Sequence, residues 1–87
     1  MKFYYTYVLL SQKDYQFYIG YSEDVFSRLR VHNRGGNTST KNRRPLELIY
    51  FEAFLNKKDA LRREKYFKTT KGKTTLKQMM REYLAEK

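Results

Sequence analysis

Residues 3–10 read Phe-Tyr-Tyr-Thr-Tyr-Val-Leu-Leu, and residues 15–21 read Tyr-Gln-Phe-Tyr-Ile-Gly-Tyr. Aromatic and β-branched residues dominate both stretches and favour strands, and the nearly continuous apolar run of the first is typical of a central strand covered on both faces. Residues 11–14 are polar turn formers, so the two stretches predict a hairpin. Because side chains alternate along a strand, Tyr7 and Tyr18 can project to one face of the sheet if the register permits.

The remainder of the chain predicts helices around one further strand. A helix with Ser22 as its N-cap should run to about Asn33, where Gly35 and Gly36 stop it. The basic segment 35–44 lacks periodicity and predicts a loop. The later elements are a strand at 46–54, a helix opened by an Asn56/Asp59 capping box and running to about Lys68, and a last helix marked by Leu76, Met79, Met80 and Tyr83.

The composition restricts the class of protein. A length of 87 residues fits one domain, residues 1–87, with a single small core. The chain has no cysteine and one histidine, which excludes disulfides, thiolate metal sites and histidine-rich clusters, so any metal must be held by oxygen. No apolar run approaches the ~20 residues that span a bilayer and no signal peptide is apparent, so we expect a cytoplasmic protein without a membrane partner.

The net charge is +10, and the basic residues gather in two runs, residues 28–44 and 57–81, that contain few acids. Nine tyrosines and six phenylalanines could stack on bases. Such a surface fits a polyanion that releases counterions on binding, so we expect nucleic acid as the partner; a solvated face kept for solubility is the alternative. The residues predicted to contact nucleic acid are Arg30, Arg34, Lys41, Arg43, Arg44, Lys68 and Lys73.

Glu64 is a lone acid within an apolar helical stripe. At about 100° per residue it projects together with Ala60 and Phe67 toward the core side. A carboxylate in that position needs a partner. It would either pair with a neighbouring Lys or Arg, or hold Mg²⁺ with water and a substrate phosphate completing the coordination.

Arg28 and His32 lie one helical turn apart, so their side chains can reach one spot beside the sheet. That spot could seat a phosphate. Arg28 would pair with the phosphate, while His32 would orient a water, donate to an oxygen or transfer a proton. The alternative is that Arg28 pairs with Asp24 and that His32 is a satisfied residue at the rim of the core.

In order and spacing, five residues together resemble the functional set of the GIY-YIG nuclease family: Tyr7, Tyr18, Arg28, His32 and Glu64. Tyr5-Thr6-Tyr7 stands where the family has its GIY element, with Gly and Ile replaced, and Tyr18-Ile19-Gly20 matches the second element fully. Residues 22–33 are similar to the family's first helix, and residues 61–64 to the segment with its metal-binding glutamate. The likeness covers roughly residues 4–72 and is strongest to small, free-standing bacterial members and to structure-specific nucleases.

The resemblance implies an α+β fold with a small three-stranded antiparallel sheet flanked by helices. It also implies a DNA endonuclease that hydrolyses phosphodiester bonds with one Mg²⁺ or Mn²⁺ ion on Glu64, structure-specific and acting in DNA repair or recombination. Tyr7 would act as, or position, the base for an attacking water, which requires positive charge to lower its pKa or a loss of its proton in concert with water. Tyr18 and Arg28 would stabilise the developing charge, and His32 would assist.

Many family members carry a polar residue, often asparagine, about a dozen positions after the glutamate. Here that neighbourhood is Lys73 to Leu76, and Lys73 is the candidate substitute. The alternative function is a non-catalytic basic nucleic-acid-binding module with a vestigial nuclease site; the charge argues against a third reading, a purely structural domain. A protein partner or a homodimer could complete the site, in the bacterial cytosol or nucleoid.

Overall fold

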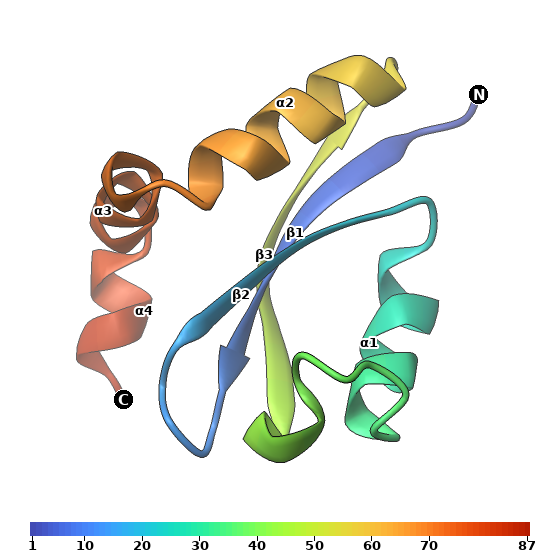
Figure 1. The fold of residues 1–87 in the computed structure, drawn as a ribbon. Coiled ribbons are helices and arrows are strands. Elements are labelled where there is room, and N and C mark those ends of the chain that lie inside the picture. Colours follow the sequence, from blue (N-terminus) through green and yellow to red (C-terminus); the bar gives the residue numbers. More distant parts are fainter.

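The computed structural model describes residues 1–87 and has a three-stranded antiparallel sheet with helices on both sides (Figure 1). Strands β1 (Tyr4–Ser11), β2 (Phe17–Ser22) and β3 (Leu46–Phe54) are ordered β2-β1-β3, so β1 is central. The predicted hairpin and α+β class are confirmed, and β3 has the predicted bounds. Strand β2 begins at Phe17 instead of Tyr15, because Tyr15 lies in the turn with a φ of 56°.

The two faces of the sheet bury separate apolar clusters. Helix α1 (Val25–Asn33) covers one face, and helices α2 (Lys57–Phe67), α3 (Thr70–Met79) and α4 (Arg81–Ala85) lie toward the other (Figure 1). The cluster under α1 consists of Tyr7, Leu9, Val25 and Leu46. The opposite cluster consists of Val8, Ile19, Phe67, Leu76 and Met80. Successive residues of β1 therefore point to opposite faces, as the alternation of a strand requires.

Helix α1 begins two residues later than expected. Its N-cap is Asp24, whose carboxylate accepts a hydrogen bond from the backbone N–H of Ser27 at 3.1 Å. The predicted cap, Ser22, instead accepts the backbone N–H of Asp24 with its hydroxyl. Both residue types suit an N-cap, and here Ser22 shapes the turn that delivers Asp24 to the helix.

The end of helix α1 is as predicted. Gly35 has a φ of 79°, a left-handed conformation that glycine adopts without strain. The backbone N–H of Gly35 bonds to the carbonyl of His32, and that of Gly36 to the carbonyl of Val31. This pair of bonds is the Schellman motif, and it ends the helix at Asn33.

Helix α2 begins as predicted after Asn56, whose side chain accepts the backbone N–H of Lys58. The capping box is incomplete, because the carboxylate of Asp59 accepts hydrogen bonds from Arg62 instead. The predicted last helix is in fact two helices, α3 and α4, which are separated at Met80. Met80 is buried but its neighbour Met79 is exposed, so the two do not share one apolar stripe. No helix is long and apolar enough to cross a membrane.

The segment 35–44, predicted as a loop, contains one short 3₁₀ turn, η1 (Lys41–Arg43), and is fastened at both sides. The hydroxyl of Ser11 in β1 donates to the carbonyl of Arg43 at 2.6 Å. The side chain of Asn33 bonds both the N–H and the carbonyl of Leu46. The loop thereby returns across the last turn of α1, where its central residues meet that helix.

Candidate active site

Tyr7 and Tyr18 project from neighbouring strands to the α1 face of the sheet, with ring centroids 6.4 Å apart. Tyr7 is paired in register with Gly20 of β2. A Cβ at position 20 would lie 2.8 Å from Cε2 of Tyr7 and still closer to its hydroxyl, so only glycine leaves room for the phenol. The common face expected for the two tyrosines is found, and the register places the phenol of Tyr7 over Gly20.

A chain of hydrogen bonds leads from Tyr7 into the protein. The hydroxyl oxygen of Tyr7 lies 3.0 Å from Nε2 of His32, and Nδ1 of His32 lies 2.7 Å from the hydroxyl oxygen of Thr40. Neither His32 nor Thr40 has exposed surface. The ring of Tyr18 meets the imidazole edge-on at a centroid distance of 4.9 Å. His32 is thus not a rim residue, and its ring contacts Tyr7 instead of projecting to a surface phosphate seat.

Thr40 is a site residue that sequence reasoning missed. It lies in the aperiodic loop between α1 and β3, where no pattern distinguishes it from Thr38 or Ser39. One physical signal was available: a buried imidazole needs partners for both ring nitrogens. The loop that follows the helix carrying His32 is a natural source for the second partner.

Burial determines the ionisation of Tyr7. It raises the pKa of Tyr7 to about 12, with Tyr18 adding to the rise and the nearby guanidinium of Arg28 opposing it. Tyr7 is therefore a neutral phenol at pH 7. Of the two conditions for Tyr7 to act as a base, a pKa lowered by positive charge is not met, because the effect of Arg28 is smaller than that of burial.

The same burial keeps His32 uncharged. Burial, assisted by the positive charge of Arg28, lowers the pKa of His32 to about 4. At pH 7 one ring nitrogen therefore carries a hydrogen and the other is an acceptor. The charge of Arg28 shifts the pKa of both Tyr7 and His32, so its guanidinium lies near these two side chains.

Arg28 does not form the alternative ion pair with Asp24. The carboxylate of Asp24 accepts hydrogen bonds from the backbone N–H and the hydroxyl of Ser27. None of the ion pairs of the protein includes Arg28. A half-buried guanidinium without a carboxylate partner is suited to bind an anion.

Glu64 is half-buried on α2, between the fully buried Ala60 and Phe67, as its helical position predicts. Its carboxylate pairs with Nζ of Lys68 at 3.2 Å, and 20% of the side chain is exposed. The ion-pair alternative is thus realised, but the carboxylate is still reachable from solvent. Its charge contributes to the raised pKa of Tyr7, so it lies within electrostatic range of that residue.

The oxygen donors near Tyr7 suit one kind of metal site. The protein has no group of three or more His, Asp or Glu side chains that could enclose an ion. Glu64 is therefore a single carboxylate with a partly open approach. Mg²⁺ commonly binds one or two carboxylates and keeps several waters and substrate phosphate oxygens as its other ligands. The residues present fit such an ion and do not fit an all-protein cage.

The residues predicted to contact nucleic acid fall into two groups. Five of them are exposed and form no ion pair: Arg30, Arg34, Lys41, Arg44 and Lys73. Arg43 is committed to the fold, because its guanidinium pairs with Asp14 at 3.1 Å and donates to the carbonyl of Phe17. Lys68 is the partner of Glu64.

Lys73 lies at the hairpin turn and not beside Tyr7 and Tyr18. It lines a small cavity of about 100 Å³ at the hairpin turn, together with Lys77 and Tyr15. It forms no hydrogen bond or ion pair with the residues around Tyr7. This position suits a contact with a polyanion better than the role of the family's late polar residue beside the glutamate.

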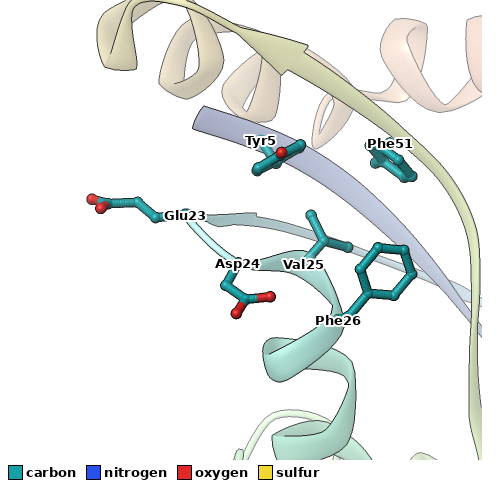
Figure 2. A pocket seen from close by; sticks show the side chains of 6 residues that line it. All are labelled: Tyr5, Glu23, Asp24, Val25, Phe26 and Phe51. Carbon is teal, nitrogen blue, oxygen red and sulfur yellow. The ribbon is translucent and has the colours of Figure 1, made fainter. Parts of the chain in front are cut away.

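A separate hollow lies at the N-terminal end of helix α1, and its volume is about 260 Å³. Figure 2 shows Tyr5 and Phe51 of the sheet facing Val25 and Phe26 of α1, with two carboxylates at the rim. The ring of Phe51 meets those of Tyr5 and Phe26 edge-on, with centroids 5.7 and 6.3 Å apart. Aromatic walls with an acidic rim distinguish this hollow from the tyrosine site, which has Arg28 beside it.

Comparison with known proteins supports the resemblance to the GIY-YIG family that the sequence indicates. Residues 3–78 match the family model described as the GIY-YIG catalytic domain. The chain is 47% identical over 57 residues to the UPF0213 protein YazA of Bacillus subtilis, covering 64% of this chain and 58% of that protein. It is 47% identical over 68 residues to a UPF0213 protein of Lacticaseibacillus paracasei, covering 77% and 75%.

One solved structure is similar over most of the fold. The solution NMR structure of a UPF0213 protein from Bacillus halodurans aligns with a TM-score of 0.55 at 34% identity, over 88% of this chain and 84% of that one. The matched family is of the nuclease type, and its model covers most of the chain. The chain belongs to the GIY-YIG family. Its relatives within that family are small bacterial UPF0213 proteins.

Proposed function

We propose that this protein is a DNA endonuclease that uses one divalent metal ion to hydrolyse phosphodiester bonds. The observation that carries the proposal is the grouping of Tyr7, Tyr18 and an unpaired Arg28, with a reachable carboxylate, Glu64, within electrostatic range of Tyr7. The net charge of +10 supports a polyanionic substrate. Membership of a catalytic-domain family of the nuclease type supports the class of reaction.

The side chains take complementary roles in this proposal. Arg28 binds the scissile phosphate and stabilises the charge that develops on its oxygens, because no carboxylate competes for its guanidinium. The hydroxyl of Tyr18 donates a hydrogen bond to the same charge. Tyr7 is a neutral phenol and orients the attacking water against the phosphate. A resting tyrosinate is unfavourable here, because the pKa of Tyr7 is raised to about 12.

His32 has a positioning role in this proposal. One ring nitrogen bonds Tyr7 and the other bonds Thr40, so the imidazole holds the phenol in place and has no nitrogen free for the substrate. This modifies the expectation that His32 acts directly on water or phosphate. The edge-on contact with Tyr18 lets the same imidazole hold both tyrosines.

Glu64 is the residue that would hold Mg²⁺ or Mn²⁺, with water and the phosphate as further ligands. A bound ion of this kind stabilises negative charge on the phosphate and on the leaving 3′ oxygen. Glu64 must exchange its contact with Lys68 for the ion. Because Lys68 is exposed to solvent, its ion pair with Glu64 contributes little stability, so the exchange costs little.

Substrate choice follows from the surface. The exposed cations Arg30, Arg34, Lys41 and Arg44 lie on α1 and the loop after it and would contact the DNA backbone. With few elements free to enter a groove and read bases, we propose recognition of DNA structure, such as flaps or junctions met in repair and recombination. We also propose that the protein acts in the bacterial cytosol or nucleoid, with a second copy of itself or another protein bound.

The test is metal-dependent cleavage. Labelled plasmid, flap and four-way-junction DNA are incubated with the protein and Mg²⁺, Mn²⁺ or EDTA, at two salt concentrations. The proposal expects nicking that EDTA abolishes. Salt-sensitive binding without cleavage of any substrate would favour the alternative, a nucleic-acid-binding module with a vestigial site. The ion pair between Glu64 and Lys68 supports that alternative, because Lys68 occupies the carboxylate that would hold the metal.

A further inference from the structure

The turn between β1 and β2 carries a tyrosine in an unfavourable backbone conformation. Tyr15 has a φ of 56°, and it is the only residue other than glycine with a positive φ. Glycine or asparagine usually occupies such a position, because a bulky side chain crowds the left-handed backbone. Tyr15 is 60% exposed, and its ring forms no ring–ring or cation–π contact. Neither the backbone nor an aromatic partner therefore favours a tyrosine in this turn.

A second unfavourable arrangement lies beside the first. Lys73 and Lys77 of α3 line a cavity of about 100 Å³ together with Tyr15. Both lysines are exposed, and neither pairs with a carboxylate. Like charges one helical turn apart repel each other. The acid of the turn, Asp14, pairs with Arg43 at 3.1 Å instead. An anion bound between the two ammonium groups would relieve the repulsion.

Tyr15 also lines a larger and mostly apolar hollow. The volume of this hollow is about 450 Å³, and its other lining residues are Leu10, Leu84 and Lys87. The ring of Tyr15 thus borders both a basic cavity and an apolar hollow. A nucleotide has the same two parts, a phosphate and a flat base, and bases of any sequence stack on exposed aromatic rings.

We infer that Tyr15, Lys73 and Lys77 form a second binding site, which holds one unpaired nucleotide of the DNA substrate. The phosphate lies between the two lysines, and the base stacks on Tyr15 over the apolar hollow. A base within a duplex is covered on both faces by its neighbours, so only a single-stranded nucleotide can make this contact. The inference rests on the proposed function for its substrate, and it narrows that substrate to DNA with a single-stranded part.

The second site is separate from the tyrosine site. Tyr15 precedes Gly20, the strand partner of Tyr7, by five residues. At about 3.4 Å per residue this separation is at most roughly 17 Å. The two sites would therefore contact different nucleotides of the substrate, and the second site can be tested by binding alone.

The ring of Tyr15 is tested in EDTA, where fluorescence anisotropy measures binding without cleavage. Tyr15→Asn suits the left-handed backbone but lacks the ring. It should raise the urea midpoint of unfolding and weaken binding to a labelled oligothymidine about 5–150-fold, the range for one stacked base. Its affinity for a blunt duplex should not change. Tyr15→Phe keeps the ring and should bind oligothymidine like the wild type.

The lysines are tested by salt dependence, with Lys71 as the matched control. Lys71 is an exposed lysine of the same helix, but it lies roughly 200° around the axis from Lys73. The double variant Lys73→Ala/Lys77→Ala should reduce the slope of log affinity for oligothymidine against log salt by about 0.7, the value for one phosphate of a single strand. Lys71→Ala should leave the slope unchanged.

Three results would overturn the inference. They are a wild-type protein that does not bind oligothymidine, a Tyr15→Asn variant with wild-type affinity for it, and a double lysine variant that behaves like Lys71→Ala. A urea midpoint that falls in Tyr15→Asn would also count against it, because the tyrosine would then serve the fold. If Tyr15→Asn does not fold, the lysine variants decide.

The same measurements separate this inference from the proposed function. Single-strand binding that depends on Tyr15, in a protein that cuts no DNA, would support the second site and refute the nuclease. Metal-dependent cleavage by a Tyr15→Asn variant that binds oligothymidine normally would support the nuclease and refute the second site.

Discussion

The phenol of Tyr7 lies directly over the backbone of Gly20, its partner on the neighbouring strand. A Cβ at position 20 would lie 2.8 Å from Cε2 of Tyr7 and closer still to its hydroxyl. The glycine of the Tyr-Ile-Gly element therefore makes space for the tyrosine of the first strand. The two sequence elements Tyr5-Thr6-Tyr7 and Tyr18-Ile19-Gly20 therefore pack together as one unit, through Tyr7 and Gly20.

Gly20→Ala is expected to destabilise the protein by about 1–3 kcal/mol, the usual cost of overpacking a core. Urea unfolding measures this loss. The cost should largely disappear in a Tyr7→Ala background, because the three atoms nearest to the added Cβ all belong to the phenol of Tyr7. An equal cost in both backgrounds would show that the strain at position 20 arises elsewhere.

The buried His32 predicts a pH dependence of stability. Burial lowers the pKa of His32 to about 4, from an ordinary value of 6.5 that the unfolded chain would show. The unfolded state therefore binds the proton more readily, and stability should fall as the pH drops below 6.5. The total loss by pH 4 is roughly 3 kcal/mol, at about 1.4 kcal/mol for each unit of pKa difference.

Urea unfolding between pH 7 and pH 5 isolates this effect, because most carboxylates titrate at lower pH. His32→Gln should remove the slope in that window. A wild-type stability that stays constant from pH 7 to pH 5 would mean that the imidazole is not held neutral in the folded protein.

Arg28 and Arg30 on helix α1 form a matched pair. Arg28 lies beside Tyr7 and His32, whereas Arg30 is exposed and donates to the hydroxyl of Ser27. Arg28→Ala should lower the cleavage rate at saturating DNA by about 10²–10³-fold, as removal of a donor to the transition state does. Arg30→Ala should weaken binding with little change in that rate. Equal rates in the two variants would remove Arg28 from the site.

Two residues of the same basic run, Arg34 and Arg43, should behave differently. Arg34 is exposed at the end of α1, whereas Arg43 ties Asp14 and Phe17 of the hairpin to the loop. Arg34→Ala should reduce the salt dependence of DNA binding by about one phosphate contact and leave unfolding unchanged. Arg43→Ala should lower the free energy of unfolding by about 1 kcal/mol. The reverse pattern would contradict the assignment.

The sequence pattern predicted those features that depend only on residues close together in the chain. Strand β3, the stop at Gly35 and the common face of Tyr7 and Tyr18 follow from periodicity, from the conformational freedom of glycine and from strand alternation. The place of Glu64 between Ala60 and Phe67 follows from the helical repeat.

The features that sequence could not predict depend on parts of the chain that meet only in the fold. His32 is buried because the loop after α1 folds back and supplies Thr40, and no sequence pattern records that return. The pKa of Tyr7 depends on enclosure by both strands and the helix, which outweighs the many cations counted in the sequence. Asp24 instead of Ser22 caps α1 because two residues of suitable type, two positions apart, compete, and the turn geometry selects between them.

The central claim is that Glu64 is the metal ligand of an endonuclease. The most direct measurement compares Glu64→Gln with wild type in cleavage of nicked, flapped and junction DNA across a titration of Mg²⁺. Glu82→Gln is the control, since Glu82 also pairs with a basic neighbour but lies on the exposed face of α4. The account predicts that Glu64→Gln binds DNA normally and fails to cut at any Mg²⁺ concentration, while Glu82→Gln cuts like wild type. Metal-dependent cleavage by Glu64→Gln at the wild-type rate would contradict it.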